Sequence, residues 1–226
     1  MVSVKSKIDH GALAGVLETI SRFQDVTIVA VTKHQSVESV ERIRSMGIQD
    51  LGVNYTVQGD ELREQIQSAE VRWHFIGQIQ SRKARQLASY HLVQSLDRIT
   101  VAKELNRALE SADIFIDALV QVNIGEEPQK AGVMPGELNA FLEEVSSEKR
   151  LRIRGLMAMP PFLDPPVKRA AYFEAMRTLF EQYRSSDFSI LSMGTTTDYE
   201  IALDYGSNMI RLGTMLFGSR PLRRHR

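Results

Sequence analysis

The chain contains no cysteine among its 226 residues, which excludes disulfide bonds, thiolate metal ligands and cysteine nucleophiles. Basic and acidic side chains number 28 each, so no excess of positive charge predicts general binding to nucleic acid. No apolar run approaches the length that crosses a bilayer, and the first residues lack the apolar core of a signal peptide. These absences predict a cytoplasmic protein that binds neither nucleic acid nor membranes.

Several functional motifs are missing as well. The five histidines show no metal-ligand spacing, so we expect no metal site. The chain has no nucleophile elbow, no Walker loop and no GxGxxG fingerprint of dinucleotide-binding folds. Its apolar content of 43% and charged content of 25% are ordinary for a globular protein. The function therefore has to be sought in the arrangement of the strands and helices.

Short apolar segments alternate with helical patterns along the chain. The predicted strands are Thr27–Val31, Gln49–Val53, Val71–Ile76, Leu92–Leu96, Ala118–Ile124, Leu151–Met159, Ser189–Met193 and Asn208–Phe217. The predicted helices are Ile8–Phe23, Val37–Met46, Val57–Ser68, Ser81–Ser89, Ile99–Glu110, Gly136–Val145, Val167–Tyr183 and Tyr199–Asp204. Neighbouring parallel strands need such crossover helices, and a count of eight strands favours a closed barrel. We expect an α/β protein, a (β/α)8 TIM barrel in a single domain over residues 1–226.

The last predicted strand is followed by no predicted helix. We therefore expect the N-terminal helix, Ile8–Phe23, to cover the gap that remains in the outer layer.

Lys33 stands where the first strand, Thr27–Val31, gives way to a loop. Active sites of such barrels lie at the C-terminal ends of the strands. An amine at this position is suited to Schiff-base formation. A lone lysine at a strand end is more often a solvated loop cation, so the assignment depends on what lies around it.

Mostly polar residues and glycines, with one methionine, stand at the C-terminal ends of the other strands, at the same end of the barrel. They are Asn54 with Tyr55, Gly77, Ser95 with Asp97, Asn123, Met157, Gly194 to Thr197, and Arg211 with Gly213 and Thr214. The opposite strand ends carry ordinary helix-to-strand turns such as Ser45-Met-Gly47. This asymmetry predicts a single site at the barrel mouth.

The ends of strands seven and eight predict a phosphate site. Thr197 and Glu200 have the spacing of a capping box, and free amides at a helix start suit a phosphate. Arg211 and Gly213 share a strand face; glycine lets the backbone approach a ligand, and an inward arginine needs an anion or another acceptor. Barrels often bind phosphate between these strands. An ordinary helix cap after a glycine turn remains the alternative.

Motifs spread from Ile28 to Gly218 resemble the pyridoxal phosphate homeostasis proteins, also called proline synthetase co-transcribed proteins. The matching segments are Ala30-Val-Thr-Lys33, Gly52-Val-Asn-Tyr55, Trp73-His-Phe-Ile-Gly-Gln-Ile-Gln80, Lys130-Ala-Gly132, Arg154-Gly-Leu-Met157, Leu191-Ser-Met-Gly194, Asp198 with Glu200, and Arg211-Leu-Gly-Thr214. The resemblance implies a barrel of the alanine racemase N-terminal type, with pyridoxal 5′-phosphate (PLP) in its mouth.

The resemblance also implies roles for individual residues. Lys33 matches the lysine that forms an aldimine with PLP, and Arg211 matches the arginine that related racemases direct at the pyridine nitrogen. The cofactor-binding set that it implies is Lys33, Asn54, His74, Ser192, Gly194, Thr196, Arg211, Gly213 and Thr214. Within this set, the resemblance implies that Asn54 and His74 line the cofactor. The residues that it implies for the phosphate are Ser192, Gly194, Thr196, Gly213 and Thr214. Lys130 matches a family lysine on a mobile loop.

The chain departs from the family pattern at four positions. Val53 replaces a usual glutamate, Thr195 and Thr196 replace a methionine and a serine, and Arg82 replaces a common asparagine. A threonine hydroxyl can replace that of serine toward phosphate. We expect these changes to alter the affinity for PLP without changing which cofactor is bound.

The function that the resemblance implies is non-catalytic binding of PLP in intracellular PLP homeostasis. Such a protein holds the reactive aldehyde on a lysine and releases it to apo PLP-dependent enzymes. The related racemases use a second domain with an opposing tyrosine; we expect none here, no catalytic residue, and a monomer. Two alternatives remain: a weak PLP-dependent racemase with Lys33 as its one base, and a cofactor-free Schiff-base aldolase.

Overall fold

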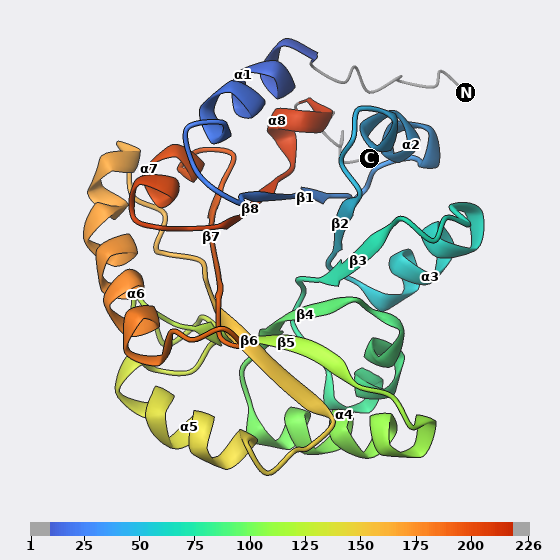
Figure 1. Ribbon diagram of the computed structural model, residues 1–226, viewed down its shortest axis with the longest axis vertical. Coiled ribbons are helices and arrows are strands. Elements are labelled where there is room, and N and C mark those ends of the chain that lie inside the picture. Colours follow the sequence, from blue (N-terminus) through green and yellow to red (C-terminus); the bar gives the residue numbers. More distant parts are fainter. Residues whose placement is uncertain (1–9, 219–226) are drawn as a thin grey trace, which may run out of the picture.

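The computed structural model of the protein describes residues 10–218, and in it eight parallel strands form a closed barrel (Figure 1). Each strand pairs with the next along the chain, and the last pairs with the first. The strands are β1 Thr27–Val31, β2 Asp50–Val53, β3 Arg72–Phe75, β4 Leu92–Leu96, β5 Ile116–Val122, β6 Leu151–Ala158, β7 Ile190–Thr195 and β8 Met209–Leu212. The predicted (β/α)8 barrel is confirmed. The domain limits 1–226 stay a prediction, because residues 1–9 and 219–226 lie outside the described range.

Helices surround the barrel (Figure 1). They are α1 His10–Ile20, α2 Val37–Ser45, α3 Thr56–Gln65, α4 Ile99–Ala112, α5 Leu138–Val145, α6 Ala170–Tyr183, α7 Tyr199–Asp204 and α8 Thr214–Phe217. Three further segments are 3₁₀ helices: η1 Ser81–Ser89, η2 Pro135–Glu137 and η3 Pro166–Arg169. The pattern at residues 81–89, predicted simply as helical, thus forms the tighter 3₁₀ type.

The end of the barrel sheet differs from the prediction. The eighth strand was expected to reach Phe217 with no helix after it; β8 instead ends at Leu212, and α8 follows. The amides of Leu216 and Phe217 donate to the carbonyl of Gly213, 3.0 Å each, which closes a helical turn. A short apolar run fits a strand or a buried helix equally well by its pattern. The helix α1 packs against α8, so the two cover this part of the barrel together (Figure 1).

The helix α2 shows how local sequence sets the limits of an element next to the site. Ser36 caps its start, accepting a hydrogen bond of 3.3 Å from the amide of Ser39. Val40 and Ile43 lie on one helix face and are fully buried against the outer side of the sheet. Gly47, with φ +94°, allows the chain to leave the helix and return to β2. The helix therefore returns the chain to the next parallel strand.

Side chains alternate between the two faces of the barrel sheet. Outward side chains such as Ala30, Leu51 and Phe75 join the helices in one large apolar core. Inward apolar side chains form a small separate cluster made of Val29, Leu92, Leu119, Met157 and Met209. The remaining interior holds polar side chains that are equally buried, namely Asp50, His74, Gln94, Ser192 and Arg211. The interior is thus filled partly by apolar and partly by polar side chains, and the polar side chains extend toward the candidate site.

Candidate functional site

Lys33 lies in the turn between β1 and α2, and this turn is firmly attached to its neighbours. The amide and hydroxyl of Thr32 both donate to the Gly52 carbonyl, at 2.9 and 3.1 Å. The Gln58 side chain, on α3, donates to the Thr32 carbonyl at 2.9 Å. Lys33 itself is half-buried, and its Nζ lies 5.3 Å from the centre of the Tyr55 ring. The structure therefore places this amine at the mouth on a fixed backbone, with an aromatic side chain beside it.

Asn54 follows β2, next to the Lys33 turn. Its Oδ1 is buried and has no hydrogen-bond partner among the described residues. The backbone of Asn54 also passes close to the end of β3, since a Cβ on Gly77 would lie 1.9 Å from the Asn54 carbonyl oxygen. An unsatisfied buried acceptor is costly, so Asn54 is suited to receive a hydrogen bond from a ligand.

Arg211 projects from β8 into the barrel and is 4% exposed. Its Nη1 donates to the carbonyl and to the hydroxyl of Ser192, at 3.0 and 2.7 Å, and its Nη2 donates to the Ala158 carbonyl at 2.9 Å. Burial lowers the pKa of Arg211 to about 10, against an opposing attraction by Asp198, so the guanidinium stays charged at neutral pH. The inward arginine expected from the sequence is present and is held by neutral acceptors.

A line of hydrogen bonds continues from Ser192 across the interior. The Ser192 hydroxyl donates to Gln94 Oε1 at 2.8 Å, and Gln94 Nε2 lies 3.0 Å from His74 Nδ1. His74 Nε2 lies 2.8 Å from Asp50 Oδ1, and Arg72 binds both oxygens of that carboxylate. Two of the predicted cofactor residues, His74 and Ser192, therefore have polar partners inside the barrel.

Asp50 is the acidic end of this line. Burial alone raises the pKa of its carboxyl, but hydrogen bonds from His74 and Arg72 outweigh that effect and lower it to about 2. The carboxylate is thus ionised at any ordinary pH. Asp50 and Gln94 were missed as site-linked residues because each lies inside a predicted strand and gives no motif; their inward position by strand alternation was the available signal.

The loop after β7 approaches the start of α8. Gly194 has φ +94°, and a Cβ there would lie 2.6 Å from Cβ of Ala202 on α7, so only glycine fits. The Thr196 hydroxyl accepts from the Met215 amide at 3.4 Å. The predicted helix start is confirmed, but the predicted capping box is wrong: α7 begins at Tyr199 after Asp198, one residue later than a Thr197 cap requires.

Gly213 and Thr214 stand at the start of α8. A Cβ on Gly213 would meet Val31 at 3.6 Å, an ordinary contact, so packing within the chain does not demand glycine there. Thr214 is exposed. Without a side chain at Gly213 the backbone is accessible, which suits the predicted close approach of a ligand.

The strand order brings most of the predicted residues together. The strands β7, β8, β1 and β2 are consecutive neighbours around the barrel, so their C-terminal ends form one continuous part of the rim (Figure 1). The residues on this part are Lys33, Asn54, Gly194, Thr196, Arg211, Gly213 and Thr214. Ser192 on β7 and His74 on β3 lie within the barrel interior, at 0% and 1% exposure.

A cavity of about 190 Å³ opens beside this part of the rim. Gly194 and Thr195 line it together with Lys130, Phe162 and an ion pair between Arg169 and Asp198. Arg169 Nη1 lies 2.6 Å from Asp198 Oδ2, and both side chains are buried, so the two charges compensate each other. Lys130 pairs with Glu127 at 2.5 Å. Arg169 lies in a stretch predicted only as helical and gave no signal in the sequence.

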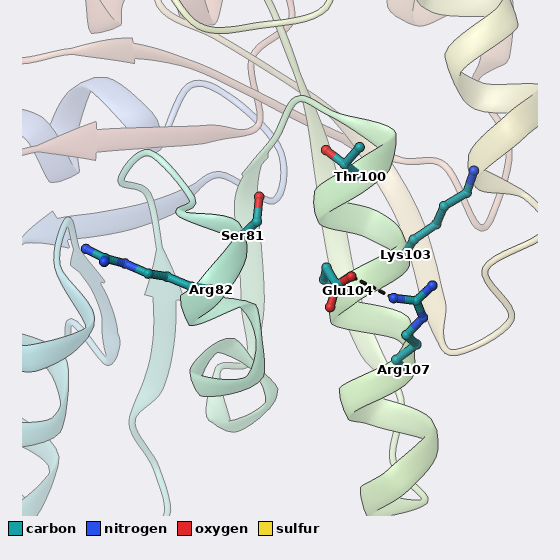
Figure 2. A pocket seen from close by; sticks show the side chains of 6 residues that line it. All are labelled: Ser81, Arg82, Thr100, Lys103, Glu104 and Arg107. Carbon is teal, nitrogen blue, oxygen red and sulfur yellow. Dashed lines mark hydrogen bonds and ion pairs between the residues drawn. The ribbon is translucent and has the colours of Figure 1, made fainter.

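A larger hollow of about 400 Å³ lies between η1 and α4 (Figure 2). Figure 2 shows Arg82 and Lys103 pointing in opposite directions away from it. Lys103 pairs with Glu144 at 2.9 Å, and Arg107 pairs with Glu104 at 2.6 Å. Because these cations are already paired or turned away, the hollow has no built binding group.

No group of three or more histidine, aspartate or glutamate side chains within residues 10–218 could hold a metal ion. No helix of this range is long and apolar enough to cross a membrane.

Fold and site together define a parallel (β/α)8 barrel with a lysine at its mouth and candidate anion-binding turns beside it. Residues 8–221 match the family model of the alanine racemase N-terminal domain. The chain is 34% identical over 198 residues to the pyridoxal phosphate homeostasis protein of Pseudomonas aeruginosa, covering 86% of this chain and 85% of that protein. It is 32% identical over 206 residues to the protein of the same name from Escherichia coli K12, covering 87% of each.

Solved structures agree with these matches. PipY of Synechococcus elongatus PCC7942, solved with PLP bound, superposes with a TM-score of 0.83 at 26% identity and covers 92% of this chain and 99% of that one. An alanine racemase of Clostridium difficile 630 superposes with a TM-score of 0.71 at 17% identity, which supports the fold alone; 60% of its chain is matched. The chain belongs to the family of pyridoxal phosphate homeostasis proteins, within the alanine racemase N-terminal domain family.

Proposed function

We propose that this protein binds pyridoxal 5′-phosphate at the barrel mouth through Lys33 and serves PLP homeostasis without a reaction of its own. The observation that carries the proposal is the fixed Lys33 turn after β1, flanked by Asn54 after β2 and by Arg211 and Gly213 at the end of β8. These strands put an amine, an unsatisfied acceptor, a buried cation and an open glycine turn on one part of the rim.

The residues present fit this cofactor. When bound, PLP supplies an aldehyde that joins an amine and a ring that can accept electrons. Lys33 supplies the amine, and Asn54 Oδ1 is an acceptor without a partner. In this proposal the hydroxyls of Thr196 and Thr214, with the backbone at Gly194 and Gly213, hold the phosphate. Of these, Thr196 makes only a long contact, 3.4 Å, which a stronger acceptor can replace.

The lack of vigorous catalysis is supported by the charge on Arg211. A guanidinium directed at the pyridine nitrogen disfavours protonation of that nitrogen, which weakens the ring as an electron acceptor. Arg211 is buried and keeps its charge at neutral pH. The names of the relatives, which match over 85–87% of their length, agree with a homeostasis role. We extend the proposal to a monomer in the cytoplasm that gives its cofactor to apo PLP-dependent enzymes.

The test is a spectrum of the protein after exposure to PLP, followed by borohydride reduction and peptide mapping. We expect a visible band that disappears on reduction as the cofactor becomes fixed on Lys33, and no such band in Lys33→Ala with the fold retained. Lys130→Ala, which removes a second lysine near the mouth, is the matched control and should keep the band. Label found mainly on Lys130 or Lys83 would contradict the assignment, and no band at all would favour the cofactor-free aldolase.

A weak racemase remains the second candidate, because the family model is that of a racemase domain. Lys33 would be its one base, and general acid–base help by a second group is typically worth about 10²–10⁴-fold. The loaded protein is incubated with L- and D-alanine and, separately, with an apo transaminase. We expect marginal racemisation and efficient delivery of PLP. Rapid turnover of alanine without delivery would favour the racemase.

A further inference from the structure

The hydrogen bonds inside the barrel have a defined direction. Arginine can only donate hydrogen bonds and an ionised carboxylate can only accept them, so the two ends of the line, Arg211 and Asp50, have fixed roles. Arg211 donates to Ser192 Oγ at 2.7 Å, so the Ser192 hydroxyl proton turns to Gln94 Oε1 at 2.8 Å. Each hydrogen bond thus determines the next one.

The same logic fixes the state of His74. With its oxygen toward Ser192, the Gln94 amide presents Nε2 to His74 Nδ1 at 3.0 Å and to the Met209 sulfur at 3.2 Å. His74 Nδ1 then accepts and carries no proton, while Nε2 carries the proton and donates to Asp50 Oδ1 at 2.8 Å. These hydrogen bonds therefore assign the Nε2–H tautomer to His74.

We propose that Asp50, His74, Gln94 and Ser192 are positioning residues that hold the Arg211 guanidinium for the cofactor through this one-directional line of hydrogen bonds. They act at a distance from the mouth, because Asp50 begins β2 and Arg211 lies near the end of β8. The four side chains are at most 6% exposed, so water does not replace a lost partner readily. A fully satisfied buried network rigidifies its members, and Arg211 is the member that borders the site.

The alternative arrangement shows why the direction matters. Protonation of His74 at Nδ1 would require the Gln94 amide to turn and present its oxygen to the ring. Two donors, from Gln94 and Arg211, would then face the Ser192 oxygen, and the Ser192 proton would lose its acceptor. The state of His74 and the hydrogen bonding of Arg211 are therefore coupled through a single amide.

The first measurement uses the protein without cofactor, so it is independent of the proposed function. Nitrogen-15 NMR of histidine-labelled protein, with His74 assigned by its replacement, should show an unprotonated Nδ1 and a protonated Nε2. Gln94→Met removes the amide at similar size and should shift the Nδ1 resonance. A proton on Nδ1 in the wild type would overturn the proposed direction.

The second measurement rests on the proposed function and follows PLP binding by absorbance. Losing one neutral hydrogen bond costs about 1 kcal/mol, so Ser192→Ala and Gln94→Met should each weaken binding about fivefold. Leu92→Met, in the same interior but outside the line, should bind within about twofold of the wild type. If Gln94→Met does not fold, Ser192→Ala, which loses only one oxygen atom, decides the outcome. Affinities equal to that of Leu92→Met would refute the positioning role, whereas a wild type that takes up no PLP would refute the proposed function alone.

Discussion

The layer between sheet and helices is built from apolar side chains, whereas the barrel interior divides its space between apolar and hydrogen-bonded polar ones. The outer layer is stabilised chiefly by burial of apolar area, which has no direction. The polar half of the interior is held by directional contacts, each of which needs a partner at the right atom. The difference indicates that the outer layer carries stability and that the inner line carries the orientation of the site.

The largest effect is expected from a cavity in the outer layer. Leu105 on α4 is 0% exposed, and Leu105→Ala should lower the free energy of unfolding by about 2–5 kcal/mol. The folded fraction should bind PLP as the wild type does, because the substitution leaves the barrel interior intact. Urea unfolding and PLP titration measure the two properties separately. If the PLP affinity of the folded protein fell together with its stability, the proposed division of roles between the outer layer and the interior would be wrong.

The next largest effect is expected on the pH dependence of stability, through Asp50 in the barrel interior. The pKa of Asp50 is lowered in the folded state, so its contribution to stability is present above its unfolded pKa of about 4 and is lost as the pH falls through about 2. The depression corresponds to about 2 kcal/mol at neutral pH. Asp50→Asn should therefore be less stable at pH 7 and show a flatter decline of stability between pH 4 and 2. Unfolding curves at stepped pH test this, with Glu41→Gln, in a partly buried pair with Arg44 on α2, as the control.

A smaller effect is expected at the rim. Thr214 is exposed and has no packing role that the interior depends on, so Thr214→Val should leave stability unchanged. If its hydroxyl binds the phosphate, a charge-assisted contact of about 1.5 kcal/mol is lost and PLP binds roughly tenfold more weakly. Thr178→Val, on the outer face of α6, serves as the matched control. Equal affinities of the two variants would place the phosphate elsewhere on the rim.

The smallest effect is expected on the outer surface. Lys103 and Glu144 form an exposed pair, and such pairs contribute about 0.2–1 kcal/mol. Lys103→Ala should lower stability by no more than this and leave PLP binding unchanged. A change in PLP affinity would show that the hollow between η1 and α4 communicates with the mouth.

Local pattern was enough to predict the barrel and the position of Lys33. Alternating strands and helices indicate parallel neighbours, and the rule that sites lie at the C-terminal strand ends selects one end. The prediction was wrong at residues 213–217, because an apolar run of this length fits a strand as well as a helix. The chain turns from β8 into α8 at Gly213, and no periodicity in the sequence shows this change of direction.

The interior line could not be predicted from the sequence, because its contacts join distant residues. Ser192 and Gln94 are 98 positions apart, and the sequence does not show which polar residues of different strands face each other. His74 is hydrogen-bonded to Asp50 and Gln94, which come from the two neighbouring strands. Such side-chain pairs can be assigned only when the register in which neighbouring strands pair is known.

The pairing of β1 with β8 also has a consequence for the order of events in synthesis. Lys33 follows the first strand, whereas Arg211 and Gly213 follow almost the whole remainder of the chain, and the register that brings them together is Val29 beside Arg211. While β8 is still inside the ribosome, the part of the chain that has emerged therefore carries the Lys33 amine without Arg211 and without the Gly213 turn. Closing the ring is a long-range step that forms after the local helices. The ability to capture the cofactor should thus arise abruptly, when the last strand docks, and not gradually as the polypeptide grows.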